Sequence, residues 1–458
     1  MNRMVQGQRG SEVEDALAGP AVAPATTETI GERLRRLRTA AGLTQTELAA
    51  GRFTKEYLSQ IERGKTRPTD QTVAWLAERL GVDTGLLLTG VSSIELSRWE
   101  ATLARGEALS ESGEHGRAAT EFARVRADVH ASAARELELR ALLGEGWAIL
   151  SEGEVRTAEG LLLEARQLAE HSRVSDVERA DVLFRLGVCR YHLSSIPTAL
   201  GLFDAALDLL ERSDLPSDVL RARILDWRSR CYRRQRDWQA AREDVERALE
   251  LAEGLNNRRV VAQVYFQASL IAEREGHWVL ARSYAERARA CYEELSDREN
   301  VGRLLNNLGG LTYLLGNPEE GIAHLKDSLR ILLETGSQEE AAHVITSLAE
   351  IYVGLGQAVE AEQEARRAIE LLGGRVDFLA EFGTAQLTLG KALLEQGRLD
   401  EAQETLGDAD RSFEQLSSAS HRAAVWVALG DVAARRGDDR EAARLYRRAA
   451  ETLQDFRF

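Results

Sequence analysis

The feature that most constrains the fold is a periodic pattern of small residues that begins near Arg98 and continues to the end of the chain. Each unit has a central small residue, with further small residues twelve positions before it and seven positions after it. Nine units follow one another at spacings of 40 to 42 residues. An irregular helical bundle would not keep this register, so the pattern predicts a stack of nine similar helical pairs. The central residues are Ala118, Ala158, Ala199, Ala241, Ala281, Gly321, Ala361, Ala402 and Ala442.

A turn position lies five residues before each central residue. Seven of these nine positions are glycine, and the other two are Ser194 and Arg236. Glycine is favoured where a chain leaves a helix through the left-handed conformation. Each unit is therefore expected to be two helices joined by a tight turn. The small residues that precede the turns are Gly106, Gly146, Gly187, Ser229, Ser269, Gly309, Ala349, Gly390 and Gly430.

The composition agrees with a helical protein. Of 458 residues only 6 are proline and 29% are charged, while aromatic residues make up 6%. The three cysteines are far apart in the sequence, which argues against a disulfide framework and favours a reducing cytoplasm. No apolar run reaches the roughly 18–20 residues of a membrane span, and no signal peptide is evident. We therefore expect an all-α, cytoplasmic protein without a membrane segment.

The repeated pattern resembles the tetratricopeptide repeat, in which small residues allow paired helices to approach closely. The usual repeat has about 34 residues. A spacing near 40 residues predicts that the helices or the connections are longer here. The resemblance implies an α-solenoid of about nine helical pairs over residues 99–458.

A different unit precedes the repeats, and residues 28–90 contain the signals of five short helices. Thr44 and Glu47 form a capping-box pattern, and Thr54 is a suitable N-cap for a helix from Lys55 to Arg63. Apolar residues recur at helical spacing in each segment, and residues 86–88 are expected to close the core. We expect residues 1–27 to be a disordered tail, since they show no apolar periodicity, and residues 91–98 to be a linker.

Residues 28–90 resemble the helix-turn-helix domain of the lambda-repressor and Cro type. The likeness is carried by Gly42-Leu43-Thr44-Gln45, Leu48-Ala49 and the segment from Ser59 to Lys65. The turn from Gly51 to Thr54 is one residue shorter than usual, and we expect Phe53 to fill the space of the missing aliphatic residues. Arg38 and Glu62 match a pair that forms a salt bridge between helices in this family.

The resemblance implies that the third helix enters the DNA major groove. Residues at its N-terminal end are expected to face base edges, and Gln45 is expected to hold a phosphate at the start of the second helix. Three basic residues at the far end of the third helix are expected to contact the DNA backbone. The DNA-binding residues are thus Gln45, Lys55, Glu56, Ser59, Gln60, Arg63, Lys65 and Arg67.

The distribution of charge supports DNA binding by this unit. The whole chain has a formal charge of −15, but residues 30–67 carry nine basic and four acidic side chains, a local balance of +5. The remainder is therefore at −20, so a small basic domain is joined to a large acidic body. This asymmetry argues against contact between residues 98–458 and DNA.

The sequence gives no sign of catalysis. It lacks a phosphate-binding loop with the G-x-x-x-x-G-K-[ST] pattern, the H-E-x-x-H zinc motif and the G-x-S-x-G nucleophile motif. Its eight histidines do not have metal-ligand spacing. We expect no catalytic residue, no metal and no cofactor.

In tetratricopeptide arrays the first helix of each pair lines a concave face. Counting from the small residues places a set of polar side chains from units four to seven on that face, where Asn and Arg could hold the backbone and carboxylate of an extended peptide. The alternative is that each is an ordinary surface residue. The expected groove residues are Arg223, Asp226, Arg230, Arg233, Gln263, Arg303, Asn306 and Glu350.

The domain order resembles that of bacterial peptide-pheromone-responsive regulators. It implies a transcriptional regulator that binds double-stranded DNA as a homodimer, with an array that senses a peptide or protein or that mediates dimerisation. The alternative is an interaction scaffold whose helix-turn-helix unit contacts protein rather than DNA. The local charge of +5 favours the first hypothesis.

Overall fold

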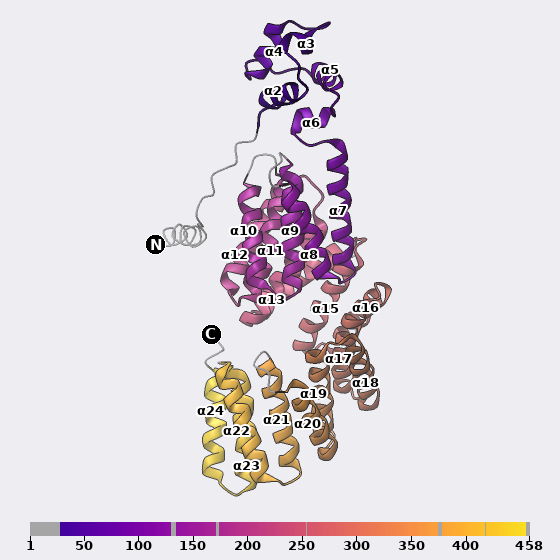
Figure 1. Ribbon diagram of the computed structural model, residues 1–458. Coiled ribbons are helices and arrows are strands. Elements are labelled where there is room, and N and C mark those ends of the chain that lie inside the picture. Colours follow the sequence, from indigo (N-terminus) through magenta and orange to yellow (C-terminus); the bar gives the residue numbers. More distant parts are fainter. Residues whose placement is uncertain are drawn as a thin grey trace, which may run out of the picture. The chain divides into compact units, whose positions relative to one another are not determined.

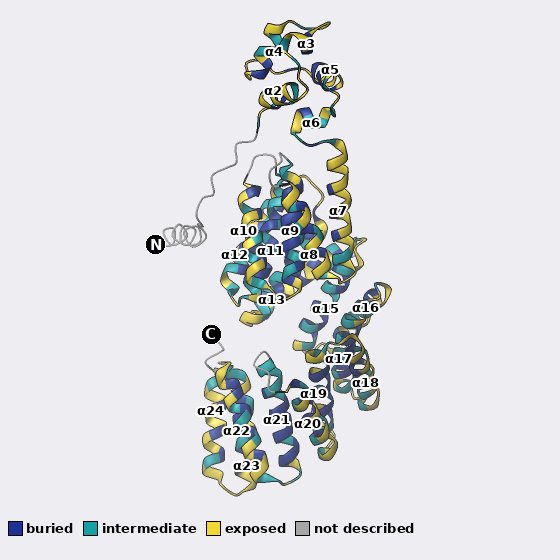
Figure 2. Cartoon of the chain, viewed as in Figure 1, coloured by how far each residue is buried: buried dark blue, intermediate teal, exposed yellow. Residues whose placement is uncertain are grey.

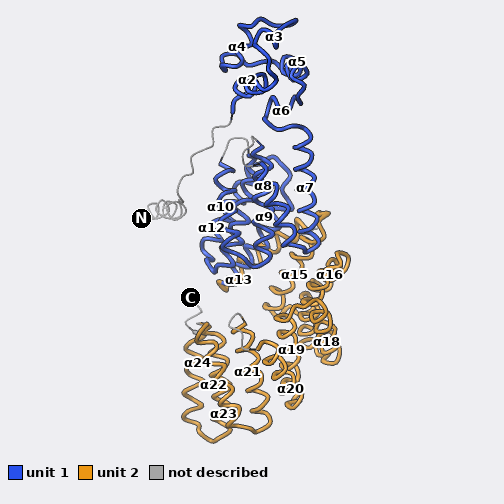
Figure 3. The backbone as a smooth tube through the Cα atoms, in the orientation of Figure 1, with its two compact units in different colours: residues 1–234 blue, residues 235–458 orange. Residues whose placement is uncertain are grey.

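The computed structural model describes residues 28–454 except 130–133, 171–173, 253, 374–377 and 417. The tail expected at residues 1–27 lies outside the described residues. In the described ranges every regular secondary-structure element is a helix, which confirms the all-α prediction (Figure 1). The chain divides into two compact units, Met1–Arg234 and Gln235–Phe458 (Figure 3).

Five short helices form the N-terminal domain, as predicted. Threonine caps four of them, at Thr29, Thr44, Thr54 and Thr69, and Asp83 caps the fifth, each by accepting a hydrogen bond from a first-turn backbone N–H. The helices are α2 (Ile30–Ala40), α3 (Gln45–Ala49), α4 (Lys55–Glu62), α5 (Asp70–Leu80) and α6 (Thr84–Thr89).

The core of this domain is a single apolar cluster. Leu34, Leu48 and Leu58 are at most 1% exposed. Phe53 packs against this cluster beside Tyr57 and Trp75, with ring centroids 5.3 and 5.1 Å away, so its expected role is confirmed. The expectation for residues 86–88 was wrong at one position, because Leu87 is buried whereas Leu88 is 44% exposed. The short helix α6 presents only one of the two side chains inward.

Helix α7 (Ser93–Glu111) begins directly after the domain. Ser92 and Glu95 form a capping box at its start. Most of the segment 91–98, expected to be a linker, is therefore the first turns of a helix. Val91, just before the helix, is buried in one cluster with Trp99 and Leu103.

The rest of unit 1 continues as paired helices. The two helices of each pair pack together, α7 with α8, α9 with α10, and α11 with α12. The helices after α7 are α8 (His115–Val129), α9 (Arg135–Ser151), α10 (Val155–Ala169), α11 (Asp176–His192), α12 (Ile196–Arg212) and α13 (Asp218–Gln235).

Unit 2 has the same construction. After α14, five successive pairs pack together, from α15 with α16 to α23 with α24. The helices are α14 (Trp238–Ala252), α15 (Arg258–Arg274), α16 (Trp278–Glu294), α17 (Arg298–Leu314), α18 (Pro318–Thr335), α19 (Gln338–Gly354), α20 (Ala358–Leu372), α21 (Leu379–Glu395), α22 (Leu399–Gln415), α23 (Ala419–Arg435) and α24 (Asp439–Gln454).

The predicted register is confirmed at the turns. All nine turn positions have positive φ, between 59° and 89°, including the two that are not glycine. Ser194 has φ 59° and Arg236 has φ 62°, so the repeat imposes the left-handed turn even where a side chain makes it unfavourable. The central small residues are all buried. Figure 2 colours the buried residues of the helices dark blue.

The small residues before the turns lie against large side chains sixteen positions later in the sequence. A Cβ added at Gly106, Gly187 or Gly430 would lie within 2.9 Å of the aromatic ring sixteen residues on, and one at Gly309 or Gly390 within 2.6 Å of a leucine. Where the residue before the turn is Ser or Ala, the residue sixteen positions later is smaller than the Leu, Phe or Tyr that faces a glycine. The glycine pairs are Gly106–Phe122, Gly146–Leu162, Gly187–Phe203, Gly309–Leu325, Gly390–Leu406 and Gly430–Tyr446, and two pairs without glycine are Ser269–Ala285 and Ala349–Ala365.

Candidate nucleic-acid interface and ligand groove

Helix α4 presents one apolar and one polar face. Leu58 and Ile61 are buried in the domain core. Lys55, Glu56 and Gln60 are exposed on the other side, and Ser59 is half-buried. The four residues expected to face base edges therefore occupy the side of α4 that is open to a partner.

The cations around α4 are not neutralised by neighbours. In the described residues, no carboxylate lies within ion-pairing distance of Lys55, Arg63, Lys65 or Arg67, and all four are exposed. Many arginines of the repeats, by contrast, pair with Asp or Glu, as in Arg126 with Glu145 at 2.6 Å. Unpaired cations at one end of a helix are available to neutralise phosphates.

A buried polar network holds α2, α3 and α4 together. Nε of Arg38 donates to Oε1 of Glu62 at 2.6 Å, which confirms the predicted salt bridge. Nε2 of Gln45 donates to Oε2 of the same carboxylate at 2.7 Å. The sequence predicts that Gln45 binds a DNA phosphate. It does not reveal the contact with Glu62, because the two residues are 17 positions apart and no local pattern joins them. The amide of Gln45 is thus fixed in place at the start of α3.

Gln60 is held by a residue beyond the helix. Its Oε1 accepts a hydrogen bond from the hydroxyl of Thr66 at 3.1 Å. This bond engages the amide oxygen and leaves the amide nitrogen of Gln60 as a donor without a partner among the described residues. Thr66 was not singled out from the sequence, where it appears only as a polar residue between Lys65 and Arg67.

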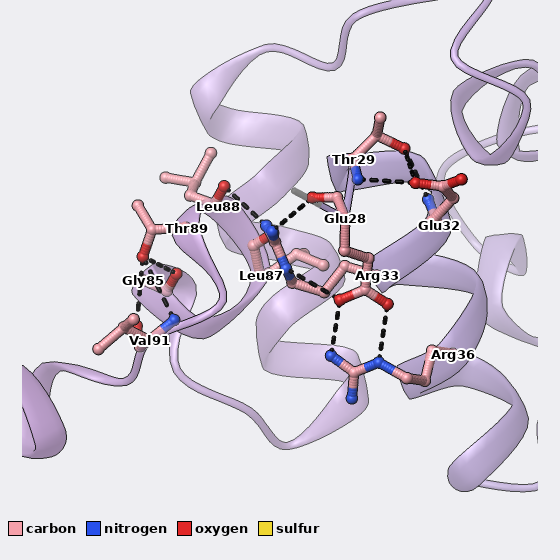
Figure 4. A network of polar contacts seen from close by, with 10 residues as sticks. All are labelled: Glu28, Thr29, Glu32, Arg33, Arg36, Gly85, Leu87, Leu88, Thr89 and Val91. Atoms are coloured by element: carbon pink, nitrogen blue, oxygen red, sulfur yellow. Dashed lines mark hydrogen bonds and ion pairs between the residues drawn. The ribbon is translucent and has the colours of Figure 1, made fainter. Parts of the chain in front are cut away.

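Sequence reasoning also missed the contacts of Arg33, which join α2 to α6 (Figure 4). Nη1 of Arg33 donates to the carbonyl oxygens of Leu87 at 3.1 Å and Leu88 at 2.8 Å. Nη2 donates to the carbonyl oxygen of Glu28 at 2.8 Å, and the Glu28 carboxylate also binds Arg36. Burial lowers the pKa of Arg33, which Glu28 opposes. Arg33 is only 5% exposed, so this cation serves the fold rather than DNA.

The start of α7 is bonded to the same domain. The carboxylate of Asp83 caps α6 and also accepts hydrogen bonds from the backbone N–H of Ser93 at 3.1 Å and from its hydroxyl at 2.9 Å. These bonds lower the pKa of Asp83, the Ser93 hydroxyl contributing most. The domain and the first repeat helix are therefore linked by side-chain bonds as well as by the chain.

The expected groove residues in the first compact unit, residues 1–234, lie on α13. Arg223 lies over the rings of Trp147 and Phe184, and Arg230 lies over Trp227 with its guanidinium carbon 4.4 Å from the ring centroid. Asp226 is not a surface residue, since it is 2% exposed and binds Arg230 at 2.9 Å. Arg233, also expected there, is half-buried.

The expected groove residues in the second compact unit, residues 235–458, lie on α15, α17 and α19. Arg303 forms ion pairs of 2.9 Å with Glu299 and with Glu340. Asn306 has a buried Oδ1 with no hydrogen-bond partner among the described residues. Gln263 is half-buried and Glu350 is exposed.

The described residues lack two further features, a metal site and a membrane-spanning helix. No group of three or more His, Cys, Asp or Glu side chains is arranged to hold a metal ion there. None of the described helices combines the length and the apolar character needed to cross a membrane.

Comparison with known families agrees with both parts of the chain. Residues 29–101 match a family described as a helix-turn-helix domain. Residues 176–254, 300–372 and 381–455 match a family described as a tetratricopeptide repeat. One relative is an uncharacterized HTH-type transcriptional regulator from Sinorhizobium fredii. It is 44% identical over 61 residues, which make up 13% of this chain and 79% of that protein.

Solved structures resemble the repeats in fold. The apo form of the quorum sensor NprR from B. thuringiensis matches with a TM-score of 0.59 and 13% identity, covering 78% of this chain and 99% of that one. A Rap protein complexed with Competence and Sporulation Factor matches with a TM-score of 0.54 and 16% identity, covering 79% of this chain and 98% of that one. At these identities the likeness establishes the fold alone.

Proposed function

We propose that this chain, which belongs to the helix-turn-helix family of transcriptional regulators, binds double-stranded DNA as a homodimer. We further propose that a ligand of its tetratricopeptide array controls this binding. The observation that carries the DNA-binding part is the set of exposed, unpaired cations at and beyond the end of α4. The relative in Sinorhizobium fredii is named as a regulator of the same type. We accordingly propose a non-enzymatic role in the cytoplasm.

Each expected contact follows from the chemistry of its side chain. Lys55 can read guanine O6 and N7, Gln60 can pair with adenine, and Glu56 can accept from cytosine N4. Arg63, Lys65 and Arg67 would bind phosphates and set the register of the domain on the duplex. Gln45 stands at the N-terminus of α3, where backbone N–H groups favour a phosphate.

The ligand-binding part of the proposal rests on the polar side chains of the first helices in each pair. Arg223 and Arg230 in unit 1, and Asn306 in unit 2, bring hydrogen-bonding groups to helices otherwise built for close packing. NprR is described as a quorum sensor, and the Rap protein was solved with a bound factor. We propose that a peptide or protein ligand acts on this array in a comparable way.

Ligand binding would act on DNA affinity by changing the distance between the DNA-binding domains of the two protomers. Half-sites on one face of DNA lie about 34–36 Å apart, so a modest change in the separation of two attached domains decides whether both can bind. The bonds between Asp83 and Ser93 would pass such a change from α7 to the DNA-binding domain without loss in a flexible linker.

The direct test is an electrophoretic shift with the full-length protein and DNA from upstream of its own gene, at several salt concentrations. Each neutralised phosphate contributes about −0.9 to the slope of log affinity against log salt. We expect a steep slope that becomes shallower by about one unit in Lys65→Ala. Lys326→Ala removes an exposed lysine of α18 and should leave the slope unchanged. Affinity that does not vary with salt would favour the scaffold alternative.

A further inference from the structure

The guanidinium of Arg223 on α13 lies over two aromatic rings, those of Trp147 on α9 and Phe184 on α11. Its central carbon is 5.0 Å from the ring centroid of Trp147 and 4.6 Å from that of Phe184. The two rings themselves are stacked, 6.0 Å apart. In the described residues Arg223 makes no ion pair and no hydrogen bond. Burial lowers the pKa of Arg223 to about 10, and the neighbouring Arg185 adds to the effect.

A second unsatisfied group lies one turn further along α13. Oδ2 of Asp226 accepts a hydrogen bond from Arg230 at 2.9 Å, but Oδ1 is buried without a partner in the described part of the chain. Burial raises the pKa of Asp226, and Arg230 opposes this. In the described residues, Oδ1 of Asp226 is therefore a hydrogen-bond acceptor without a partner, and the nearby guanidinium of Arg223 is a donor without a partner.

The repeat register shows that Asp226 differs from its counterparts in the three preceding units, whereas two later units have Asn306 and Thr346 at this position. It stands three positions before the first small residue of its unit, and the same position in the three preceding units is Leu103, Leu143 and Phe184. A buried ion pair is often no more stable than the apolar residues that could replace it. A buried acid at a position that the three preceding units fill with leucine or phenylalanine thus indicates a role other than packing.

The two carboxylates beside Arg223 are each paired with another arginine. Asp181 pairs with Arg185 at 2.9 Å, and its Oδ1 is also buried without a partner in the described residues. Asp226 pairs with Arg230 in the same way, so neither carboxylate forms an ion pair with Arg223, whose guanidinium is open to an anion. A monoanionic carboxylate fits the planar guanidinium through two parallel hydrogen bonds. An N–H group next to it would satisfy Oδ1 of Asp226.

We propose that Arg223 and Asp226 form the anchor of the ligand site, for a carboxylate that has an N–H donor beside it. Two kinds of molecule carry this group: the C-terminus of a peptide and an N-acylated amino acid. Arg223 binds the carboxylate, Asp226 accepts from the N–H, and Trp147 and Phe184 hold the guanidinium in position. This inference rests on the proposed function, since it names the chemistry of the ligand that the array would sense.

The test measures retention of small molecules by the full-length protein, using equilibrium dialysis followed by mass spectrometry. Three probes are compared: a pool of random tetrapeptides with free carboxylates, the same pool with amidated C-termini, and a pool of N-acetyl amino acids. We expect retention from a free-acid pool at least about tenfold above the amidated pool, since a hydrogen bond to a charged group is lost on amidation. Retention from the tetrapeptides alone identifies a peptide, and equal retention of N-acetyl amino acids identifies a small acid.

Two variants test the anchor itself. Arg223→Gln should remove the preference for free acids. Arg228→Gln, which alters an arginine of the same helix that pairs with Asp204, should keep it. The proposal is overturned if neither free-acid pool is retained, if the amidated pool is retained equally, or if Arg223→Gln binds like the parent.

Thermal melting separates anchoring from a purely structural role. Arg223→Met keeps an apolar chain of similar length against the two rings and removes a half-buried cation. We expect a melting temperature equal to or above that of the parent, since binding residues are commonly kept at a cost in stability. A clear fall would assign Arg223 to the fold and overturn the proposal. Retention of acids without any DNA shift would instead refute the proposed function and leave the ligand site in place.

Discussion

The backbone of Gly187 lies directly against the ring of Phe203, so closely that a methyl group at residue 187 would stand 2.5 Å from Cε1 of the ring. Gly187 is on α11 and Phe203 is on α12, sixteen residues later. The same spacing joins a small and a large residue in other units of both halves of the chain. The close approach of the two helices in a pair therefore depends on matched volumes at two positions.

Gly187→Ala should destabilise unit 1, because the added methyl overlaps the Phe203 ring. Overpacking of this kind typically costs about 1–3 kcal/mol. Phe203→Leu should relieve the overlap, so the double variant should be more stable than the two single effects predict. Chemical denaturation followed by circular dichroism measures all three. Gly201→Ala is the matched control, since nothing lies within 4 Å of an added Cβ there, and it should be neutral or stabilising.

Ala241→Leu and Ala281→Leu should each lower stability by roughly 1–3 kcal/mol. Both residues are central small positions and both are 0% exposed, so a larger side chain must displace a neighbouring helix. The exposed Ala290 on α16 gives a control, and Ala290→Leu should melt like the parent. Unchanged melting in both buried variants would show that these positions are not close helix contacts.

Gln60→Ala and Lys65→Ala should affect DNA binding in different ways. Gln60, with its oxygen bound to Thr66, offers an amide donor to a base, and its loss should relax discrimination at one base position by about 1–3 kcal/mol. Loss of Lys65 should weaken binding to all sequences alike. Selection from a randomised DNA pool with each variant measures both effects. Equal specificity profiles in Gln60→Ala and the parent would place base reading elsewhere.

Glu62→Gln should destabilise the DNA-binding domain, because it leaves the Arg38 guanidinium uncompensated inside the polar network. Removal of one partner from a buried pair costs about 3–5 kcal/mol, and we expect the lower part of that range since Arg38 is 13% exposed. Arg38→Met with Glu62→Leu should recover most of the stability. DNA affinity should remain low in the double variant, because Gln45 has lost the carboxylate that fixes its amide. Wild-type affinity there would show that Gln45 needs no such support.

The sequence was sufficient for features that depend on residues close together along the chain. The nine turns were placed from spacing alone, and even Ser194 and Arg236 adopt the left-handed conformation. The caps at Thr44 and Thr54 follow in the same way, since a capping side chain bonds to a backbone group three residues later. Helix geometry sets these contacts within one or two turns.

The partners of the polar side chains were decided only by the tertiary structure. Gln45 matched a phosphate-binding position, yet its amide binds Glu62; Asp226 was counted onto an open face, yet it is 2% exposed. Leu88 was expected inside and is 44% exposed, because the short helix α6 turns the neighbouring Leu87 into the core instead. The repeat period thus determined by itself that the chain forms stacked helical pairs, since helical periodicity is local. Which charges are neutralised and which remain open to a ligand depended on helices distant in the sequence, since long side chains bond to whatever the packing brings near.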